Sequence, residues 1–327
     1  MSGKKKKISK QKTSSKRIVF KNIERDLGLL LIPIILLVVL QILSIYLKTI
    51  NAETSAITLA SESIGTPVTE YTFFNRPITP PISAEAAIII DRDSKTVLFE
   101  KNAHLRFSMA STTKIMTALV ALDNFKPDDI LTTVTSHVEG VNVGVEVGDR
   151  LYFKDALYAM LLPSGNDIAY LIAQNYPGGE DAFILAMNSK AKSLHLNNTH
   201  YSDPAGLNDD GNFTTASELS QLAAIASENP TLSDVTATKS KIIQTVGGTK
   251  IFTLINLNQL LGQYGVIGMK TGHTEGAGDV LITSAIDSGR TFIIVVMRSQ
   301  NRFVDTEMLL SSLISSVTTF TPRSFTN

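Results

Sequence analysis

The chain of 327 residues contains no cysteine. This absence excludes disulfide bonds, a thiol nucleophile and metal sites ligated by cysteine. A domain exported without disulfides must rely on its hydrophobic core, and an apolar content of 43% is enough for a sizeable one. The five histidines form no H-E-x-x-H or H-x-H pattern, and "SDPAGLNDDGN" (202–212) lacks the spacing of a calcium loop. The sequence therefore predicts no metal and no cofactor.

Basic charge is scarce in most of the chain. Residues 1–26 hold ten Lys and Arg against two acidic residues, a net charge of +8. The remaining residues hold 20 basic side chains (30 minus 10) and 28 acidic ones (30 minus 2), a net charge of −8. A nucleic-acid-binding domain needs a basic patch on its folded part. We therefore expect no nucleic-acid partner.

Residues 27–47 contain no charged side chain at all. A helix of this length spans about 30 Å, the thickness of a bilayer core, and a soluble helix rarely lacks a polar face over so many turns. The run is longer than the roughly 7–15 apolar residues of a signal peptide, so we expect an uncleaved anchor, although Ala52 offers a small residue for cleavage. The basic residues 1–26 should then stay in the cytoplasm, and the chain after residue 48 should lie outside it.

Residues 48–84 are rich in Ser, Thr and Pro, which is typical of a linker. The folded domain is expected over residues 85–320. Periodicity predicts helices at 111–123, 154–162, 167–175, 180–194, 215–228 and 302–317, and strands in a hairpin after residue 85 and at 241–246, 250–255, 279–287 and 291–297. Strands near both ends of the domain with helices between them predict an α/β (α+β) sandwich, in which helices cover a mostly antiparallel sheet.

The first chemical motif is the pair Ser111 and Lys114 in "MASTTKIMTALVAL" (109–122). Residues three apart lie on the same face of a helix, so the amine can approach the hydroxyl. A serine needs a base to become a good nucleophile, and a lysine can serve once burial or nearby positive charge lowers its pKa. Alone, this pattern is better explained by a helix-capping serine and a solvated lysine.

Two further motifs follow. "PSGND" places Ser164 and Asn166 in a break between apolar segments, where a hydroxyl and an amide can relay a proton and hold a peptide carbonyl. "KTG" lies just before a strand-like run and supplies a cation in Lys270, a hydroxyl in Thr271, and in Gly272 room for a substrate backbone. An interhelical turn and a glycine-rich turn are the plainer interpretations of these two segments.

The three motifs occur in the order S-x-x-K, S-x-N and K-T-G, 53 and then 106 residues apart. With "LYAMLLPSGNDIA", "NNTHYSDPAGLND" and "GMKTGHTEGAGDVL", the chain resembles the serine D-alanyl-D-alanine carboxypeptidases, low-molecular-mass penicillin-binding proteins of the S11 peptidase type. The resemblance covers about residues 85–310. It implies the penicillin-binding-protein/β-lactamase-like fold, the peptidoglycan stem peptide as substrate and β-lactams as covalent inhibitors.

The resemblance also implies roles for single residues. Ser111 would be the acylated nucleophile, Lys114 its proton acceptor, and Ser164 an aid to proton transfer. Substrate contacts would come from residues of the other two motifs and the histidine after the last one: Asn166, Lys270, Thr271, Gly272 and His273. In the family, backbone N–H groups corresponding to Ser111 and His273 form the oxyanion hole.

Several alternatives remain open at this point. A D,D-endopeptidase or a glutaminase uses the same nucleophilic motif. A class A β-lactamase needs a further glutamate for deacylation, but Glu180 is only 16 residues beyond Ser164 and the next glutamate is Glu218. An inactive wall-binding protein would not need all three motifs intact. The sequence therefore favours a membrane-anchored carboxypeptidase that removes the terminal D-Ala from stem pentapeptides.

Overall fold

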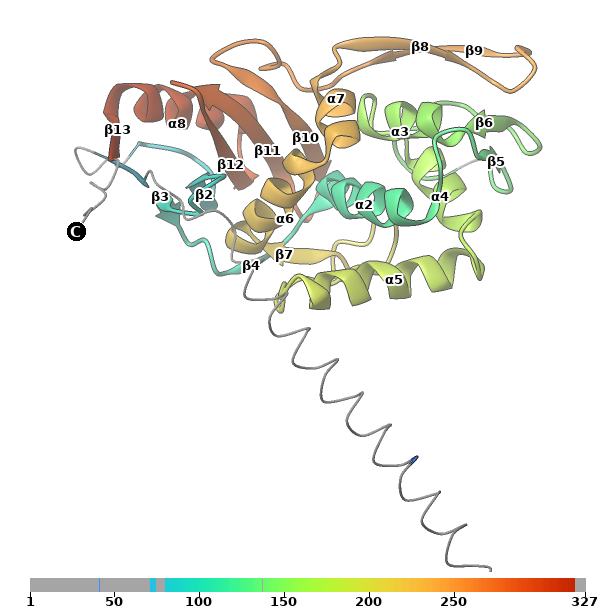
Figure 1. Ribbon diagram of the computed structural model, residues 1–327, viewed down its shortest axis with the longest axis horizontal. Helices are drawn as coiled ribbons and strands as arrows, with labels where there is room; N and C mark the ends of the chain where they lie inside the picture. The colour runs from blue at the N-terminus through green and yellow to red at the C-terminus, as the bar shows by residue number, and fades with distance from the viewer. Residues whose placement is uncertain (1–40, 42–70, 75–79, 137, 321–327) are drawn as a thin grey trace, which may run out of the picture. The chain divides into compact units, whose positions relative to one another are not determined.

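The largest sheet among the described residues has five antiparallel strands in the order β10-β11-β12-β2-β3 and lies to one side of helices α2 to α5 (Figure 1). The computed structural model describes residues 41, 71–74, 80–136 and 138–320. The strands of this sheet are β2 (Ala86–Asp91), β3 (Val97–Lys101), β10 (Val266–Thr274), β11 (Gly278–Asp287) and β12 (Arg290–Ser299). The early strand β2 pairs with the late strand β12 on one side and with β3 on the other, so the predicted sheet built from both ends of the domain is confirmed.

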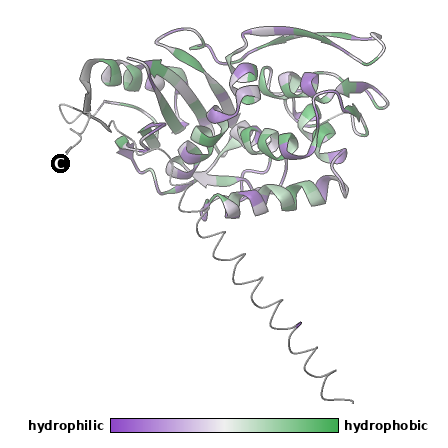
Figure 2. Cartoon of the chain, in the orientation of Figure 1, coloured by the Kyte–Doolittle hydropathy of each residue, from purple (hydrophilic) through white to green (hydrophobic). Residues whose placement is uncertain are grey.

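Both faces of this sheet are buried, which explains why its central strands are apolar without interruption. In β12, Ile293 and Val295 belong to one core cluster, whereas Ile294 and Val296 belong to a second cluster. Successive side chains of a strand point to opposite faces, so "FIIVVM" supplies both cores. Figure 2 shows the hydrophobic colouring of these strands.

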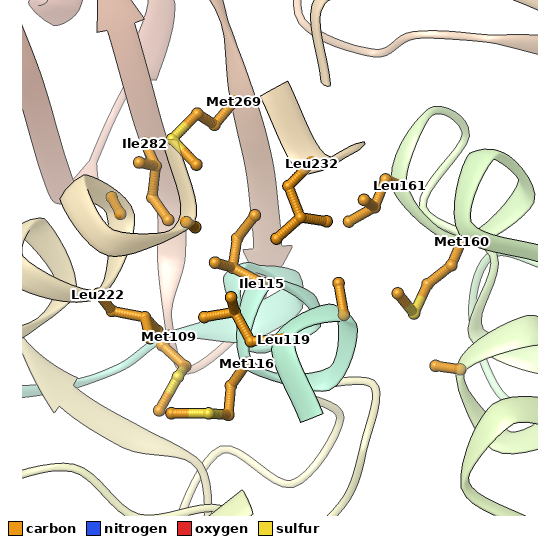
Figure 3. Packing of buried hydrophobic residues seen from close by; sticks show 14 of the residues in the cluster. Met109, Ile115, Met116, Leu119, Met160, Leu161, Leu222, Leu232, Met269 and Ile282 are labelled. Carbon is orange, nitrogen blue, oxygen red and sulfur yellow. The ribbon is translucent and has the colours of Figure 1, made fainter. Parts of the chain in front are cut away.

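Helices cover the two faces unequally. The helical segments are η1, a 3₁₀ turn (Ala110–Thr113), α2 (Lys114–Asn124), α3 (Phe153–Leu161), α4 (Asn166–Gln174), α5 (Gly179–Ser193), α6 (Ala216–Glu228), α7 (Pro230–Ala237) and α8 (Arg302–Ser316). Helix α8 packs on one face against β11 and β12, and α6 packs on the other against β12 and β2. Figure 3 shows α2 surrounded by apolar side chains of α3, α6, α7, β10 and β11, so the chain after Ser111 is held in the larger core.

Four two-stranded ribbons complete the described fold. They are β1 (Tyr71–Phe74) with β13 (Val317–Phe320), β4 (Arg106–Ser108) with β7 (Phe213–Thr215), β5 (Ile130–Thr132) with β6 (Arg150–Tyr152), and β8 (Ser240–Gln244) with β9 (Ile251–Ile255). Strand β1 lies within the range predicted as a linker. Farther along that range, the Ser83 and Ala84 N–H groups donate to the Asp305 carboxylate of α8 at 2.8 and 2.7 Å.

The helices expected from periodicity are present, with ends shifted by a few residues. One expected boundary was wrong: the regular helix begins at Lys114 rather than at Ser111, because Ser111 lies in the 3₁₀ turn η1. The K-T-G motif precedes strand β11, as expected, but it also lies within a strand of its own, β10, whose glycines, lysine and threonines obscure the apolar pattern of a strand. Helix α7 was missed, although Pro230 at its first position and the Asn229 cap are start signals.

The predicted membrane segment, residues 27–47, lies outside the described residues apart from Gln41, as does the basic tail 1–26. Among the residues that are described, no helix combines the length and the apolar character needed to cross a bilayer.

Candidate active site

Ser111 lies on a tightly packed turn beside the edge strand β10. The preceding residue, Ala110, has a φ of +47°, an uncommon conformation for a residue with a side chain. Gly206 packs so closely on this turn that an added Cβ would lie 1.9 Å from the Ala110 carbonyl oxygen. From the other side, a Cβ on Gly272 would lie 3.1 Å from the Ser111 nitrogen. Neighbouring segments therefore hold the backbone of Ser111 in place, which is typical of strained turns at functional sites.

Lys114 is fully buried, and its Nζ has three oxygen neighbours. The Oγ of Ser111 lies at 2.9 Å, the Oδ1 of Asn166 at 2.7 Å and the carbonyl oxygen of Ala205 at 2.8 Å. Burial lowers the pKa of Lys114 to about 7, against the opposing effect of the negative charges of Asp203 and Asp167. Near neutral pH a large fraction of this amine is therefore unprotonated.

The neighbours of the amine decide where its lone pair points. The Ala205 carbonyl and the Asn166 Oδ1 can only accept, so they take two N–H bonds of a neutral amine. The Asn166 amide is fixed in this orientation because its Nδ2 donates to the Glu139 carbonyl at 2.6 Å. The remaining direction is toward Ser111, whose hydroxyl can donate to the lone pair. This arrangement can remove a proton from the serine.

Ser164 and Lys270 form a second pair, on the side of β10. The Nζ of Lys270 lies 3.0 Å from the Ser164 Oγ and donates to the Thr271 carbonyl at 2.8 Å. Ser164 has a φ of +67°, so the "PSGN" break is a specific conformation and not a plain interhelical turn. Burial, followed by the positive charges of Lys114 and Arg302, holds the pKa of Lys270 well below its usual value of 10.5.

The structure thus connects Ser111 and Asn166 through the amine of Lys114, and it pairs Ser164, in the break between α3 and α4, with Lys270 on the adjoining strand β10. Thr271 is buried next to Lys270, and Gly272 is the residue that lets β10 approach the Ser111 turn. The side chain of His273 is exposed, and its Nδ1 lies 2.8 Å from the Asp279 Oδ1. Of the predicted site residues, only His273 has a side chain that turns outward.

Sequence reasoning missed three contributors to this geometry. The Ala205 carbonyl binds Lys114, and Asp203 accepts hydrogen bonds from the backbone of the loop that carries this carbonyl. Arg302 donates to the Gly272 carbonyl at 3.0 Å and to Asp279 at 2.8 Å, so it supports the K-T-G strand from α8. The Asp-rich composition of 202–212 was the available signal for the loop. Arg302 carries no local signal.

These features define a serine acyl-transfer centre in which a lysine is the nearest base. A family model for D-alanyl-D-alanine carboxypeptidases, peptidase S11, matches residues 74–301. The chain belongs to this family.

The chain is also similar to individual D-alanyl-D-alanine peptidases. The D-alanyl-D-alanine carboxypeptidase of Streptomyces sp. (strain K15) is 34% identical over 266 residues, which cover 75% of this chain and 89% of that protein. The D-alanyl-D-alanine endopeptidase of Pseudomonas aeruginosa is 35% identical over 212 residues, 63% of this chain and 68% of that protein. The solved structure of the Streptomyces K15 DD-transpeptidase superposes with a TM-score of 0.69 at 32% identity and covers 73% of this chain and 100% of its own.

Proposed function

We propose that this chain is a serine D-Ala-D-Ala carboxypeptidase that removes the terminal D-Ala from peptidoglycan stem pentapeptides through an acyl-enzyme on Ser111. The observation that carries the proposal is the Nζ of Lys114, which lies 2.9 Å from the Ser111 Oγ while two pure acceptors occupy its other directions. A base with a pKa of about 7 suits proton transfer near neutral pH.

In the first step, Lys114 takes the hydroxyl proton as the Ser111 oxygen attacks the carbonyl between the two terminal D-alanines. The new C–O bond gives a tetrahedral oxyanion, which the backbone N–H groups of Ser111 and His273 would stabilise. Each donor of an oxyanion hole contributes about 3–4 kcal/mol to the lowering of such a barrier. The C–N bond then breaks, and the leaving amine receives a proton from Lys114 or through Ser164.

In the second step, water attacks the acyl ester, Lys114 accepts a proton from this water, and Ser111 regains its hydroxyl hydrogen. The product is the stem peptide shortened by one D-Ala. Asn166 would hold the peptide carbonyl of the substrate while it keeps the amine of Lys114 in position.

Lys270 and Thr271 would bind the terminal carboxylate of the substrate, on a strand that Gly272 brings close to the nucleophile. In the free enzyme, burial holds the pKa of Lys270 well below its usual value. An arriving carboxylate opposes this effect, since an opposite charge in contact raises the pKa of a lysine. Substrate binding should therefore raise the pKa of Lys270.

The test of this proposal is covalent labelling of the full-length chain by a fluorescent penicillin, which mimics the acylating substrate. The wild type should form a stable adduct at Ser111, identified by mass analysis of its peptides, and Ser111→Ala should form none. Equal labelling of Ser111→Ala would contradict the assignment of the nucleophile.

A D,D-endopeptidase is the second candidate, because the similar proteins of Pseudomonas aeruginosa and Escherichia coli are named D-alanyl-D-alanine endopeptidases. Free D-Ala released from a pentapeptide supports the carboxypeptidase, whereas split cross-linked dimers support the endopeptidase. A class A β-lactamase needs a further glutamate that activates the deacylating water. The carboxylate of Glu218 instead accepts hydrogen bonds from both the backbone and side-chain N–H groups of Asn198, so a β-lactamase is disfavoured.

We further propose that residues 27–47 anchor the enzyme in the cell membrane, with the site outside the cytoplasm. The support is the uncharged run of 21 residues after a basic tail. Cell fractionation tests this: the full chain should sediment with membranes, and proteolysis within the predicted linker should release an active fragment. Recovery of the intact chain in the soluble fraction would contradict the anchor.

A further inference from the structure

The loop of residues 203–208 contacts Lys114 and the residue directly before Ser111. Its Ala205 carbonyl accepts from the Lys114 Nζ at 2.8 Å. Its Gly206, with a φ of +83°, packs against the carbonyl of Ala110, directly before Ser111. A displacement of this loop would therefore move the amine and release the turn of the nucleophile at the same time.

A single buried carboxylate organises this loop. The Oδ1 of Asp203 accepts from the backbone nitrogens of Ala205 at 2.8 Å and Gly206 at 2.6 Å, and the Oδ2 accepts from that of Asn208 at 2.9 Å. The Leu207 nitrogen lies within 3.2 Å of both oxygens. The Asn212 side chain also donates to the Oδ2. Hydrogen bonds to an ionised acceptor are the strong ones, so the loop conformation depends on this side chain.

Helix α2 holds the same loop at a second point. The Thr117 hydroxyl donates to the Pro204 carbonyl at 2.6 Å, one turn after Lys114. The loop is thus attached to the helix that carries Lys114 by Thr117 and is shaped internally by Asp203.

We infer that Asp203 is a positioning residue for the acylation reaction, because it shapes the loop that presents the Ala205 carbonyl to Lys114 and supports the turn of Ser111. The inference rests on the proposed function and names a residue that touches neither the nucleophile nor the substrate. Asp203 acts through the backbone of 205–208, and Thr117 assists by fixing Pro204.

The charge of Asp203 adds a second, measurable effect. The titratable groups facing Lys114 are Asp203 in the loop, Asp167 on α4 and Lys270 on β10, and Tyr170 of α4 faces Asp203. Of these, Asp203 contributes the largest opposition to the lowering of the pKa of Lys114 by burial. Removal of this charge should lower that pKa further.

The experiment is the rate of acylation by a fluorescent penicillin between pH 5 and pH 9 for the full-length wild type and Asp203→Asn. The acid limb of the rate reports protonation of Lys114. For Asp203→Asn we expect the limb to move to lower pH by about half a unit or more. The plateau rate should fall by about tenfold or more, because the amine is misplaced.

Two results for Asp203→Asn would overturn the inference. A lower plateau rate with an unmoved acid limb would mean that Asp203 is merely structural. A plateau rate equal to that of the wild type would mean that Asp203 does not position the amine. Asp305→Asn is the matched control, because Asp305 is also buried and accepts backbone N–H bonds, from Ser83 and Ala84, but lies on α8 at the opposite face of the sheet. Asp305→Asn should lower the thermal midpoint of unfolding and leave the plateau rate and the acid limb of acylation unchanged.

Thr117→Val keeps the charge of Asp203 and removes the attachment at Pro204. Its plateau should fall several-fold while the limb stays in place, and a wild-type plateau would overturn the role of the loop. If Asp203→Asn does not fold, Thr117→Val by itself tests the role of the loop. Absence of Ser111-dependent labelling in the wild type would instead be a failure of the proposed function, so the two failures are distinguishable.

Discussion

The Nζ of Lys114 lies 2.9 Å from the Oγ of Ser111, inside a core that leaves the lysine no exposed surface. An ordinary lysine would be protonated and of no use as a base near neutral pH, but burial makes this one titrate near pH 7. The contact therefore joins a nucleophile to a base that is functional under physiological conditions.

Replacement of Lys114 by methionine should slow acylation by a fluorescent penicillin by about 10²–10⁴-fold, the usual contribution of general base catalysis. The measurement is the time course of adduct formation. Lys154→Met is the control, because Lys154 is half exposed and pairs with Asp128 on the surface. Unchanged kinetics for Lys114→Met would show that another group accepts the proton.

Lys114→Met also tests the depressed pKa of the buried amine, through the pH dependence of the unfolding free energy. The pKa of Lys114 is lower in the folded chain than in the unfolded chain, so between pH 7 and 10.5 the unfolded state binds a proton that the folded state lacks. The wild type should therefore gain stability as the pH rises through this window, at up to about 1.4 kcal/mol per pH unit. Lys114→Met lacks this contribution.

The quantity to measure is the difference in unfolding free energy between Lys114→Met and the wild type at pH 7.5 and 9.5, in the same buffer system. The account predicts that the advantage of the methionine variant shrinks toward pH 9.5. A difference that is the same at both values would mean that the folded-state pKa of Lys114 is not depressed.

Gly272→Ala should damage the site through packing. Its Cβ would lie 3.1 Å from both the Ala110 Cβ and the Ser111 nitrogen and 3.2 Å from the Met109 carbonyl oxygen. Such overpacking costs about 1–3 kcal/mol and would push β10 away from the nucleophile. We expect acylation to slow by at least about tenfold, because small misplacements are costly in catalysis.

Gly289→Ala provides a comparison for that variant. Gly289 has a φ of +77° and lies in the turn between β11 and β12, where an added Cβ would meet no other atom within 4 Å. This substitution should lower the thermal midpoint through backbone strain while acylation proceeds at the wild-type rate. If Gly272→Ala also acylates normally, the close approach of β10 is not required.

Binding of a peptide ending in D-Ala-D-Ala should take up protons at a pH below 10.5, because the carboxylate raises the depressed pKa of Lys270. Titration calorimetry of the Ser111→Ala chain in pairs of buffers with different ionisation enthalpies, repeated over a series of pH values, measures this uptake. Lys270→Met should bind more weakly and show no uptake at this position. Heats for Ser111→Ala that are identical in both buffers at every pH of the series would contradict a rise in the pKa of Lys270 on binding.

The residues that the structure brings together at the candidate site could be recognised because each of them lies in a short, chemically distinctive segment. The central sheet was also predictable, since strands such as β12 are apolar on both faces. Strand β10 was not predicted, because Lys270, Thr271 and Gly272 stand where a strand is usually recognised by apolar residues.

What could not be predicted depends on backbone placement. The carbonyl of Ala205 orients the amine of Lys114, yet the identity of an alanine says nothing about where its carbonyl points. The role of Arg302 likewise arises from the end of α8 packing beside β10, 32 residues beyond Lys270 in the chain.

The most direct test of the central claim is mass analysis of a stem pentapeptide incubated with the full-length chain. The account predicts a tetrapeptide and one free D-Ala per peptide cleaved by the wild type, and neither product with Ser111→Ala. Equal release of D-Ala by Ser111→Ala, or an intact pentapeptide alongside split cross-linked dimers, would contradict it.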